Sequence, residues 1–125
     1  MPRMARYLKS GHLAESSIQE MIVEYIKLLG YGDSVMQMYN EGAGLAKKGT
    51  QAMKTGLRLG ASDLFIAVAN NDKHGFFLEI KSHDGVLSPS QISFLRDMDS
   101  RGYYTATVWS FEEGKDELDE YLPTK

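Results

Sequence analysis

Two apolar segments separated by a short polar stretch constrain the fold of this chain most strongly. Residues 63–69 read DLFIAVA and residues 75–81 read GFFLEIK, while the intervening NNDKH is typical of a turn. The first segment is almost uniformly apolar, which is typical of a strand buried in the middle of a sheet. We therefore predict a β-hairpin in which both strands are largely buried.

The segments on either side of the hairpin predict two helices. Residues 16–29 carry apolar side chains at helical spacing: Ile18, Met21, Ile22, Tyr25, Leu28 and Leu29. In LSPSQ, Ser88 is a candidate N-cap, Pro89 suits the first helical position and Gln91 completes a capping box. The helix that follows should end near residue 102 and bury a stripe of three residues: Ile92, Leu95 and Met98.

The remaining segments complete the predicted architecture. Residues 35–39 and 103–109 favour strands, and residues 112–121 a short acidic helix. Residues 40–60 contain five glycines and favour a loop or lid, in which residues 50–57 could form a turn of helix. The resulting order, α-β-β-β-α-β-α, predicts an α/β fold: a small mixed β-sheet flanked by helices. A chain of 125 residues without a linker or repeat is expected to form one domain over residues 1–125.

Composition excludes several classes of protein. The chain has no cysteine, which excludes disulfide scaffolds, thiolate zinc sites and cysteine nucleophiles. No apolar run approaches the length of about 20 residues that a membrane helix needs, and the basic residues 1–9 lack the apolar stretch of a secretion signal. We therefore expect an intracellular, cytoplasmic protein without a membrane partner.

Charge is unevenly distributed along the chain, although the net charge is only −3. Residues 42–62 contain four cations and no acid: Lys47, Lys48, Lys54 and Arg58. Residues 112–120 contain six acids and one lysine. A polyanion responds to the local field, so the basic segment could contact the phosphates of DNA, or it could be a solvated loop.

The hairpin carries charge where a buried strand should not. Period-two geometry puts Glu79 and Lys81 on one face of their strand. If the residue numbers of facing partners sum to about 145, Asp63 lies near Lys81 and Glu79 stands one diagonal step away. Two carboxylates brought together repel each other unless a cation intervenes, and Mg²⁺ accepts carboxylate oxygens, backbone carbonyls and water. The carbonyl of Ile80 could be a further ligand. The alternative is a structural salt bridge between Asp63 and Lys81.

An internal control shows how little the acid-x-Lys spacing means alone. The same spacing occurs at Glu113 and Lys115, within an acidic stretch that favours an exposed surface. The buried context, not the tripeptide, distinguishes Glu79 and Lys81.

Glu15 is the acid of the first helix best placed to face inward. At 100° per residue it lies at the edge of the apolar stripe, whereas Glu20 and Glu24 point to solvent. Ser17 and Glu20 also form a capping-box pattern. If the helix begins at Ser17, Glu15 precedes it and the angular argument lapses.

Four segments of the chain resemble a known family. The segments ESSIQ, GLRLGASDLF, FFLEIK and GVLSPSQISFL, in that order over residues 15–122, resemble the virus-type replication-repair nuclease (VRR-NUC) domain of the PD-(D/E)XK nuclease superfamily. The resemblance implies that Asp63 and Glu79 bind the metal, that Lys81 is the catalytic lysine, and that Glu15 and Gln91 are the acid of the first helix and the glutamine of the later one. The family usually has proline before the metal-binding aspartate, where this chain has Ser62.

The expected activity is hydrolysis of DNA by an endonuclease that depends on Mg²⁺ or Mn²⁺. Asp63 and Glu79 would hold the ion, Lys81 would orient the attacking water or stabilise developing charge, and Glu15 would hold a water of the ion or a second ion. Stand-alone members of the resembled family are typically small phage or bacterial nucleases that act as dimers, some on branched DNA. We therefore expect a homodimer that selects DNA structure, such as a Holliday junction, in a bacterial or phage-infected cell.

The sequence is also compatible with three other functions. They are a catalytically silent nucleic-acid-binding module, an exonuclease or single-strand nuclease, and a restriction-like enzyme that reads bases. We expect His83 to be an ordinary loop histidine. We expect Trp109 and Tyr103 to lie in the core or an interface rather than to form a platform for bases.

Overall fold

The computed structural model describes residues 13–38 and 54–125. They form four helices and four strands in this order: α2 (Glu15–Leu28), the 3₁₀ helix η1 (Gly32–Ser34), β1 (Val35–Gln37), β2 (Leu64–Ile66), β3 (Phe76–Ile80), α5 (Pro89–Ser100), β4 (Tyr104–Val108) and α6 (Phe111–Tyr121). The predicted order of α-helices and strands is confirmed; η1 is an addition. Within these residues no helix is both long and apolar enough to cross a membrane.

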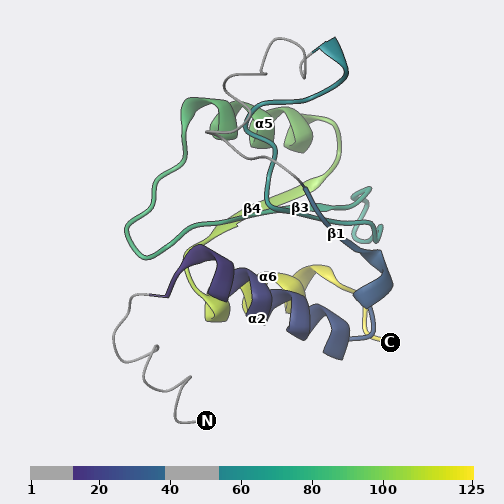
Figure 1. Ribbon diagram of the computed structural model, residues 1–125. Helices are drawn as coiled ribbons and strands as arrows, with labels where there is room; N and C mark the ends of the chain where they lie inside the picture. The colour runs from purple at the N-terminus through teal and green to yellow at the C-terminus, as the bar shows by residue number, and fades with distance from the viewer. Residues whose placement is uncertain (1–12, 39–53) are drawn as a thin grey trace.

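The four strands form one mixed sheet in the order β1-β2-β3-β4. β2 pairs antiparallel with both β1 and β3, whereas β3 and β4 run parallel and are joined through α5. Two parallel neighbours need such a crossover because the end of the first strand and the start of the second lie at opposite edges of the sheet, a full strand length apart. Figure 1 shows α5 over one face of the sheet and the pair α2 and α6 over the other.

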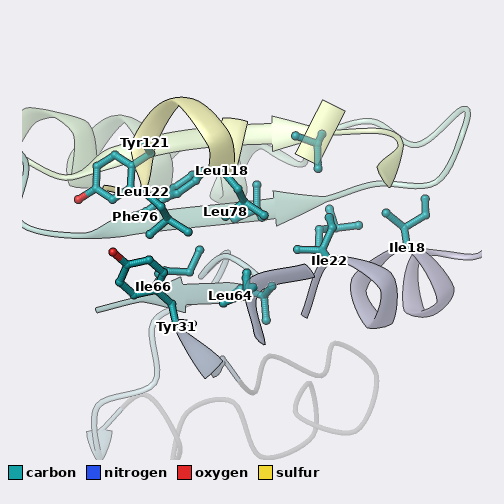
Figure 2. Close-up of a cluster of buried hydrophobic side chains, with 13 residues drawn as sticks. Ile18, Ile22, Tyr31, Leu64, Ile66, Phe76, Leu78, Leu118, Tyr121 and Leu122 are labelled. Carbon is teal, nitrogen blue, oxygen red and sulfur yellow. The ribbon is translucent and has the colours of Figure 1, made fainter. Parts of the chain in front are cut away.

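The main core lies between the sheet and the pair α2 and α6. Every residue of β3 is buried, and its even-numbered side chains point to this side. The core cluster comprises Ile18, Ile22, Ile26, Tyr31, Leu64, Ile66, Phe76, Leu78, Ile80, Val108, Leu118, Tyr121 and Leu122; ten of these are labelled in Figure 2. Two residues of α2 depart from the helical pattern read in the sequence: Leu28, which belongs to it, is 81% exposed, and Ile26, which does not, is completely buried.

α2 and α6 lie close together because Gly114 has no side chain. A Cβ at Gly114 would lie only 2.6 Å from Cδ1 of Ile22. Tyr25 adds an edge-to-face contact with Phe111, with ring centroids 5.9 Å apart, and its hydroxyl donates to the carboxylate of Asp119. This layer holds the N-terminus of α2 at the end of β3.

The opposite face carries a smaller, aromatic core under α5. Phe77 of β3 contacts Phe65 of β2 at a centroid distance of 4.5 Å and Phe94 of α5 at 5.2 Å. The predicted buried stripe of α5 was wrong at Ile92, which is 36% exposed, whereas Leu95 and Met98 are half-buried. The buried residue of the helix is Phe94, which the stripe did not include. The i, i+3 spacing identifies a helix, but a single large aromatic residue decides which side of it faces the sheet.

Candidate active site

The register of the hairpin places Asp63 beside Glu79. Leu64 pairs with Leu78 and Ile66 with Phe76, so one further step along the strands brings Asp63 opposite Glu79. The predicted register, which put Asp63 near Lys81, was wrong. Asn71 and Asp72 both adopt positive φ, 53° and 63°, and this two-residue turn closes the hairpin earlier than predicted.

Asp63 is held through both its backbone and its side chain. Its carbonyl accepts a hydrogen bond of 2.8 Å from the N–H of Met38, and its Oδ2 accepts one of 2.7 Å from the N–H of Ile80. The preceding Ser62 is completely buried, and its Oγ donates to the carbonyl of Leu64 at 3.2 Å. Ser62 therefore shapes the backbone at the position where the resembled family has proline.

Glu79, Lys81 and Gln91 meet on the α5 side of the sheet. The side chain of Glu79 is 3% exposed and that of Lys81 11%, and Nζ of Lys81 lies 3.5 Å from Oε2 of Glu79. Nε2 of Gln91 donates to the same Oε2 at 3.1 Å. Glu79 and Lys81 thus share one face, as predicted. The alternative of an Asp63–Lys81 salt bridge is not what forms: Lys81 pairs with Glu79.

The start of α5 fixes the orientation of Gln91. The predicted capping box is confirmed: Oγ of Ser88 accepts from the N–H of Gln91 at 3.2 Å, and Oε1 of Gln91 accepts from the N–H of Ser88 at 2.8 Å. Because Oε1 is engaged, Nε2 is left to donate to Glu79. Gln91 is therefore both a cap and a contact of the buried carboxylate.

Glu15 is the first residue of α2. The helix has Ala14 as its N-cap, so the alternative start at Ser17 was wrong and the angular argument applies to Glu15, although its side chain is exposed at the edge of the site. Oε2 of Glu15 accepts a long hydrogen bond of 3.4 Å from the N–H of Ser82, just beyond β3. Its negative charge also raises the pKa of Asp63, so the two carboxylates are close enough to interact.

The half-buried carboxylate of Asp63 and the buried carboxylate of Glu79 are unfavourable as a charged pair. Burial raises the pKa of Glu79 to about 8, reinforced by the charge of Asp63 and opposed by Lys81. Burial likewise raises the pKa of Asp63, although the hydrogen bond from Ile80 opposes that change. Within residues 13–38 and 54–125, Lys81 is the cation that faces these two carboxylates, and a further positive charge would relieve the conflict.

This donor set suits a hard divalent cation. Within residues 13–38 and 54–125 no three His, Cys, Asp or Glu side chains are grouped closely enough to hold an ion. Mg²⁺ needs fewer, because it commonly binds through one or two carboxylates and keeps several waters. The N–H of Ile80 points to Asp63, and in an antiparallel pair the carbonyl of the same residue points to the same side. The residues present therefore fit Mg²⁺ or Mn²⁺.

The four candidate DNA-binding cations differ in their surroundings. Lys47 and Lys48 lie outside the described residues, and Lys54 is exposed. Arg58 lies against α5: its Nη1 is 3.1 Å from Oδ2 of Asp97, and its guanidinium stands 5.3 Å from the ring centre of Phe94.

Other residues of interest lie on the surface. His83 is an exposed loop residue, as predicted. The control tripeptide lies on α6, where Lys115 pairs with Asp119 at 2.9 Å and both side chains are over 40% exposed. Trp109 is 38% exposed, so of the two predicted placements, core or interface, the core is wrong and the interface stays a prediction. The sequence carries no local signal for this position, because the pairing of β4 with β3 brings Trp109 beside Lys81.

Sequence comparisons identify no relative: no family model matches the chain, and no curated protein matches it. Comparison with solved structures finds chains of similar fold. A "VRR_NUC domain protein" superposes with a TM-score of 0.77 at 18% identity, over 88% of each chain. A second structure, "VRR_NUC domain", superposes with a TM-score of 0.59 at 24% identity, over 87% of this chain and 97% of the other. The chain described here therefore has the fold of the VRR_NUC domain.

Proposed function

We propose that the protein is a nuclease that hydrolyses phosphodiester bonds of DNA with Mg²⁺ or Mn²⁺. The observation that carries this proposal is the convergence of Asp63, Glu79, Lys81 and Gln91 at the end of one hairpin, in a fold otherwise seen in VRR_NUC domains. One buried and one half-buried carboxylate beside a single lysine stabilise the fold poorly, because they repel each other. They are a good site for a cation and a phosphate.

Each residue has a distinct role in this proposal. Asp63, Glu79 and the carbonyl of Ile80 hold the ion, which when bound polarises the phosphate and makes water more acidic. Lys81 orients the attacking water and donates to the phosphate oxygen that gains charge. Gln91 fixes the rotamer of Glu79, and Glu15 orients water at the open side of the site.

The substrate and the assembly extend the same proposal. The basic segment containing Lys47, Lys48, Lys54 and Arg58 binds backbone phosphates without reading bases, which suits selection of DNA by its structure. Cleavage of two strands of a branched molecule is simplest with two symmetric sites, so the enzyme is a homodimer. Light scattering at working concentration tests the dimer, and a monomer would contradict it.

The decisive experiment measures cleavage of end-labelled four-way junction, forked, duplex and single-stranded DNA with Mg²⁺, Mn²⁺ or a chelator. Wild type should cut a branched substrate internally and only with the metal. Lys81→Ala and Asp63→Asn should each lose at least about 100-fold in rate, an effect expected when a group that stabilises the transition state is removed. Products that shorten one nucleotide at a time would instead identify an exonuclease.

Lys115→Ala is the matched control, because it removes the lysine of the second acid-x-Lys tripeptide from the surface of α6. It should cleave at the wild-type rate. Unchanged activity in Lys81→Ala and Asp63→Asn would refute the site. Metal-independent binding without cleavage of any substrate would identify a silent binding module.

A further inference from the structure

Trp109 is an exposed aromatic residue fixed beside the candidate active site. Its side chain is pinned at one edge, because Nε1 donates to the carbonyl of Gly85 at 2.8 Å. Its backbone N–H donates to Oε1 of Glu113 at 2.7 Å. In spite of these two hydrogen bonds Trp109 remains 38% exposed. An indole held in this way presents an apolar surface to solvent at little further cost in conformational entropy.

The sheet register places Trp109 next to Lys81. β3 and β4 pair in parallel up to Ile80 and Val108, and the N–H of Lys81 donates to the carbonyl of Val108 at 2.9 Å. Trp109 is therefore the next residue on the neighbouring strand path, about 5 Å away in the sheet. Thr107, two residues earlier, is paired with Glu79, so alternation puts Trp109 on the face that carries the site.

The loop after β3 gives a second, independent link between the two residues. Gly85, whose carbonyl holds the indole, packs against Lys81: a Cβ at Gly85 would lie 3.3 Å from both Cβ and Cδ of the lysine. Val86, the next residue of that loop, is 80% exposed. The loop that packs against Lys81 therefore also holds the indole of Trp109.

We propose, as an extension of the nuclease function above, that Trp109 stacks on an unpaired DNA base next to the scissile phosphate. A phosphate bound at Lys81 brings the base of its own nucleotide within reach of the neighbouring strand path. Aromatic side chains that accept bases favour single-stranded DNA without reading sequence. A base inside a duplex is already stacked on both faces, so the indole selects an unpaired, frayed or flipped nucleotide. The feature of branched DNA that the site recognises is therefore an unpaired base next to the cleaved bond.

The chain offers a direct probe, because Trp109 is its single tryptophan. Its fluorescence is measured in the presence of chelator while the protein is titrated with one of three fluorescein-labelled DNAs: a single strand, a fork with unpaired nucleotides, or a blunt duplex. The anisotropy of the fluorescein reports the fraction of DNA that is bound. At equal bound fraction the single strand and the fork should quench Trp109, whereas the duplex should not. DNA binding without quenching, or equal quenching by duplex, would overturn the proposal.

A second arm separates stacking from a structural role. An abasic nucleotide is placed at each position flanking the cleaved bond. At one position it should weaken binding to wild type by about tenfold, the size of one base–aromatic stack. Trp109→Leu should bind the intact strand about tenfold more weakly and be insensitive to the abasic site, and Trp109→Phe should recover part of the loss.

Controls make the outcomes distinguishable. Leu28→Ala removes another exposed apolar side chain, on α2 away from the site, and should change neither binding nor the abasic effect. If Trp109→Leu weakens intact and abasic strands equally, the residue is structural and the stacking proposal is wrong. Quenching without cleavage would refute the nuclease alone, cleavage without quenching would refute the stacking alone, and absence of DNA binding would refute both.

Discussion

Gln91 joins the start of α5 to the buried carboxylate of Glu79 on β3. Its Oε1 accepts from the N–H of Ser88 at 2.8 Å, which turns Nε2 toward Oε2 of Glu79 at 3.1 Å. A helix cap is a local device, but here it also orients an amide toward a residue 12 positions earlier in the chain. The capping box therefore connects the folding of α5 to the geometry of the candidate active site.

Substitutions at the two ends of the capping box should separate stability from activity. Ser88→Ala should lower the free energy of unfolding by about 1 kcal/mol, the usual value of an N-cap, and leave cleavage within about twofold. Gln91→Ala should lose a similar amount of stability and also about tenfold in cleavage, because Glu79 is no longer oriented. Urea unfolding and initial cleavage rates measure the two effects. Equal losses of activity in both variants would contradict a positioning role for Gln91.

Stability without divalent metal should fall as the pH rises. The pKa of Glu79 is about 8 in the folded chain against an ordinary value of 4.5, so the folded state retains a proton that the unfolded state releases. The stability linked to this proton is fully present below pH 4.5 and is lost as the pH rises to about 8. The raised pKa of Asp63 acts in the same direction.

Glu79→Gln should remove most of that pH dependence. In chelator, wild type should lose about 2 kcal/mol of unfolding free energy between pH 5 and pH 8, and the variant clearly less. Urea unfolding at each pH measures the difference. Glu20→Gln, which replaces an exposed carboxylate of α2, serves as the control and should follow wild type. A wild-type stability that rises over this range would show that the carboxylates are not held as described.

A divalent ion should stabilise the folded chain through Asp63 and Glu79. At a concentration ten times the dissociation constant, binding adds about 1.4 kcal/mol, which corresponds to a rise in Tm of about 5 °C. Asp63→Asn should abolish the rise with Mg²⁺ or Mn²⁺ in a thermal melt monitored by circular dichroism. Glu112→Gln tests for loose binding to the acidic helix α6 and should keep the wild-type response. The same rise in Asp63→Asn would locate the ion elsewhere.

Gly60 should be the most sensitive glycine near the site. Its φ is +80°, and a Cβ there would lie 2.3 Å from the carbonyl carbon and oxygen of Ser90 at the start of α5. Gly60→Ala should therefore push α5 away from the segment that leads into Asp63, with a loss of at least about 2 kcal/mol in urea unfolding.

Gly56 provides the matched comparison for Gly60. Its φ is also positive, +110°, but nothing lies within 4 Å of an added Cβ. Gly56→Ala should cost only the strain of the backbone, about 1 kcal/mol. Similar losses of unfolding free energy in both variants would show that the close contact between Gly60 and Ser90 does not constrain this part of the fold.

Local sequence patterns determined the elements of this fold well. The apolar run of DLFIAVA, the capping box LSPSQ and the helical spacing of residues 16–29 each produced the element they predict, with ends that differ by a few residues. The shared face of Glu79 and Lys81 also follows from the sequence, because alternation in a strand depends only on neighbouring residues. The double use of Gln91 was likewise compatible with its sequence position.

Contacts between distant segments decided the rest. The sequence predicted Asp63 as the neighbour of Lys81, whereas the structure pairs Lys81 with Glu79. The turn at Asn71 and Asp72 sets the hairpin register, and a small shift in that register changes every facing pair. Likewise Phe94 turned α5 to a side that its spacing did not reveal, and the pairing of β4 with β3 brought an exposed Trp109 beside Lys81. Periodicity reports which residues share a face of their own element; only packing in three dimensions determines what that face meets.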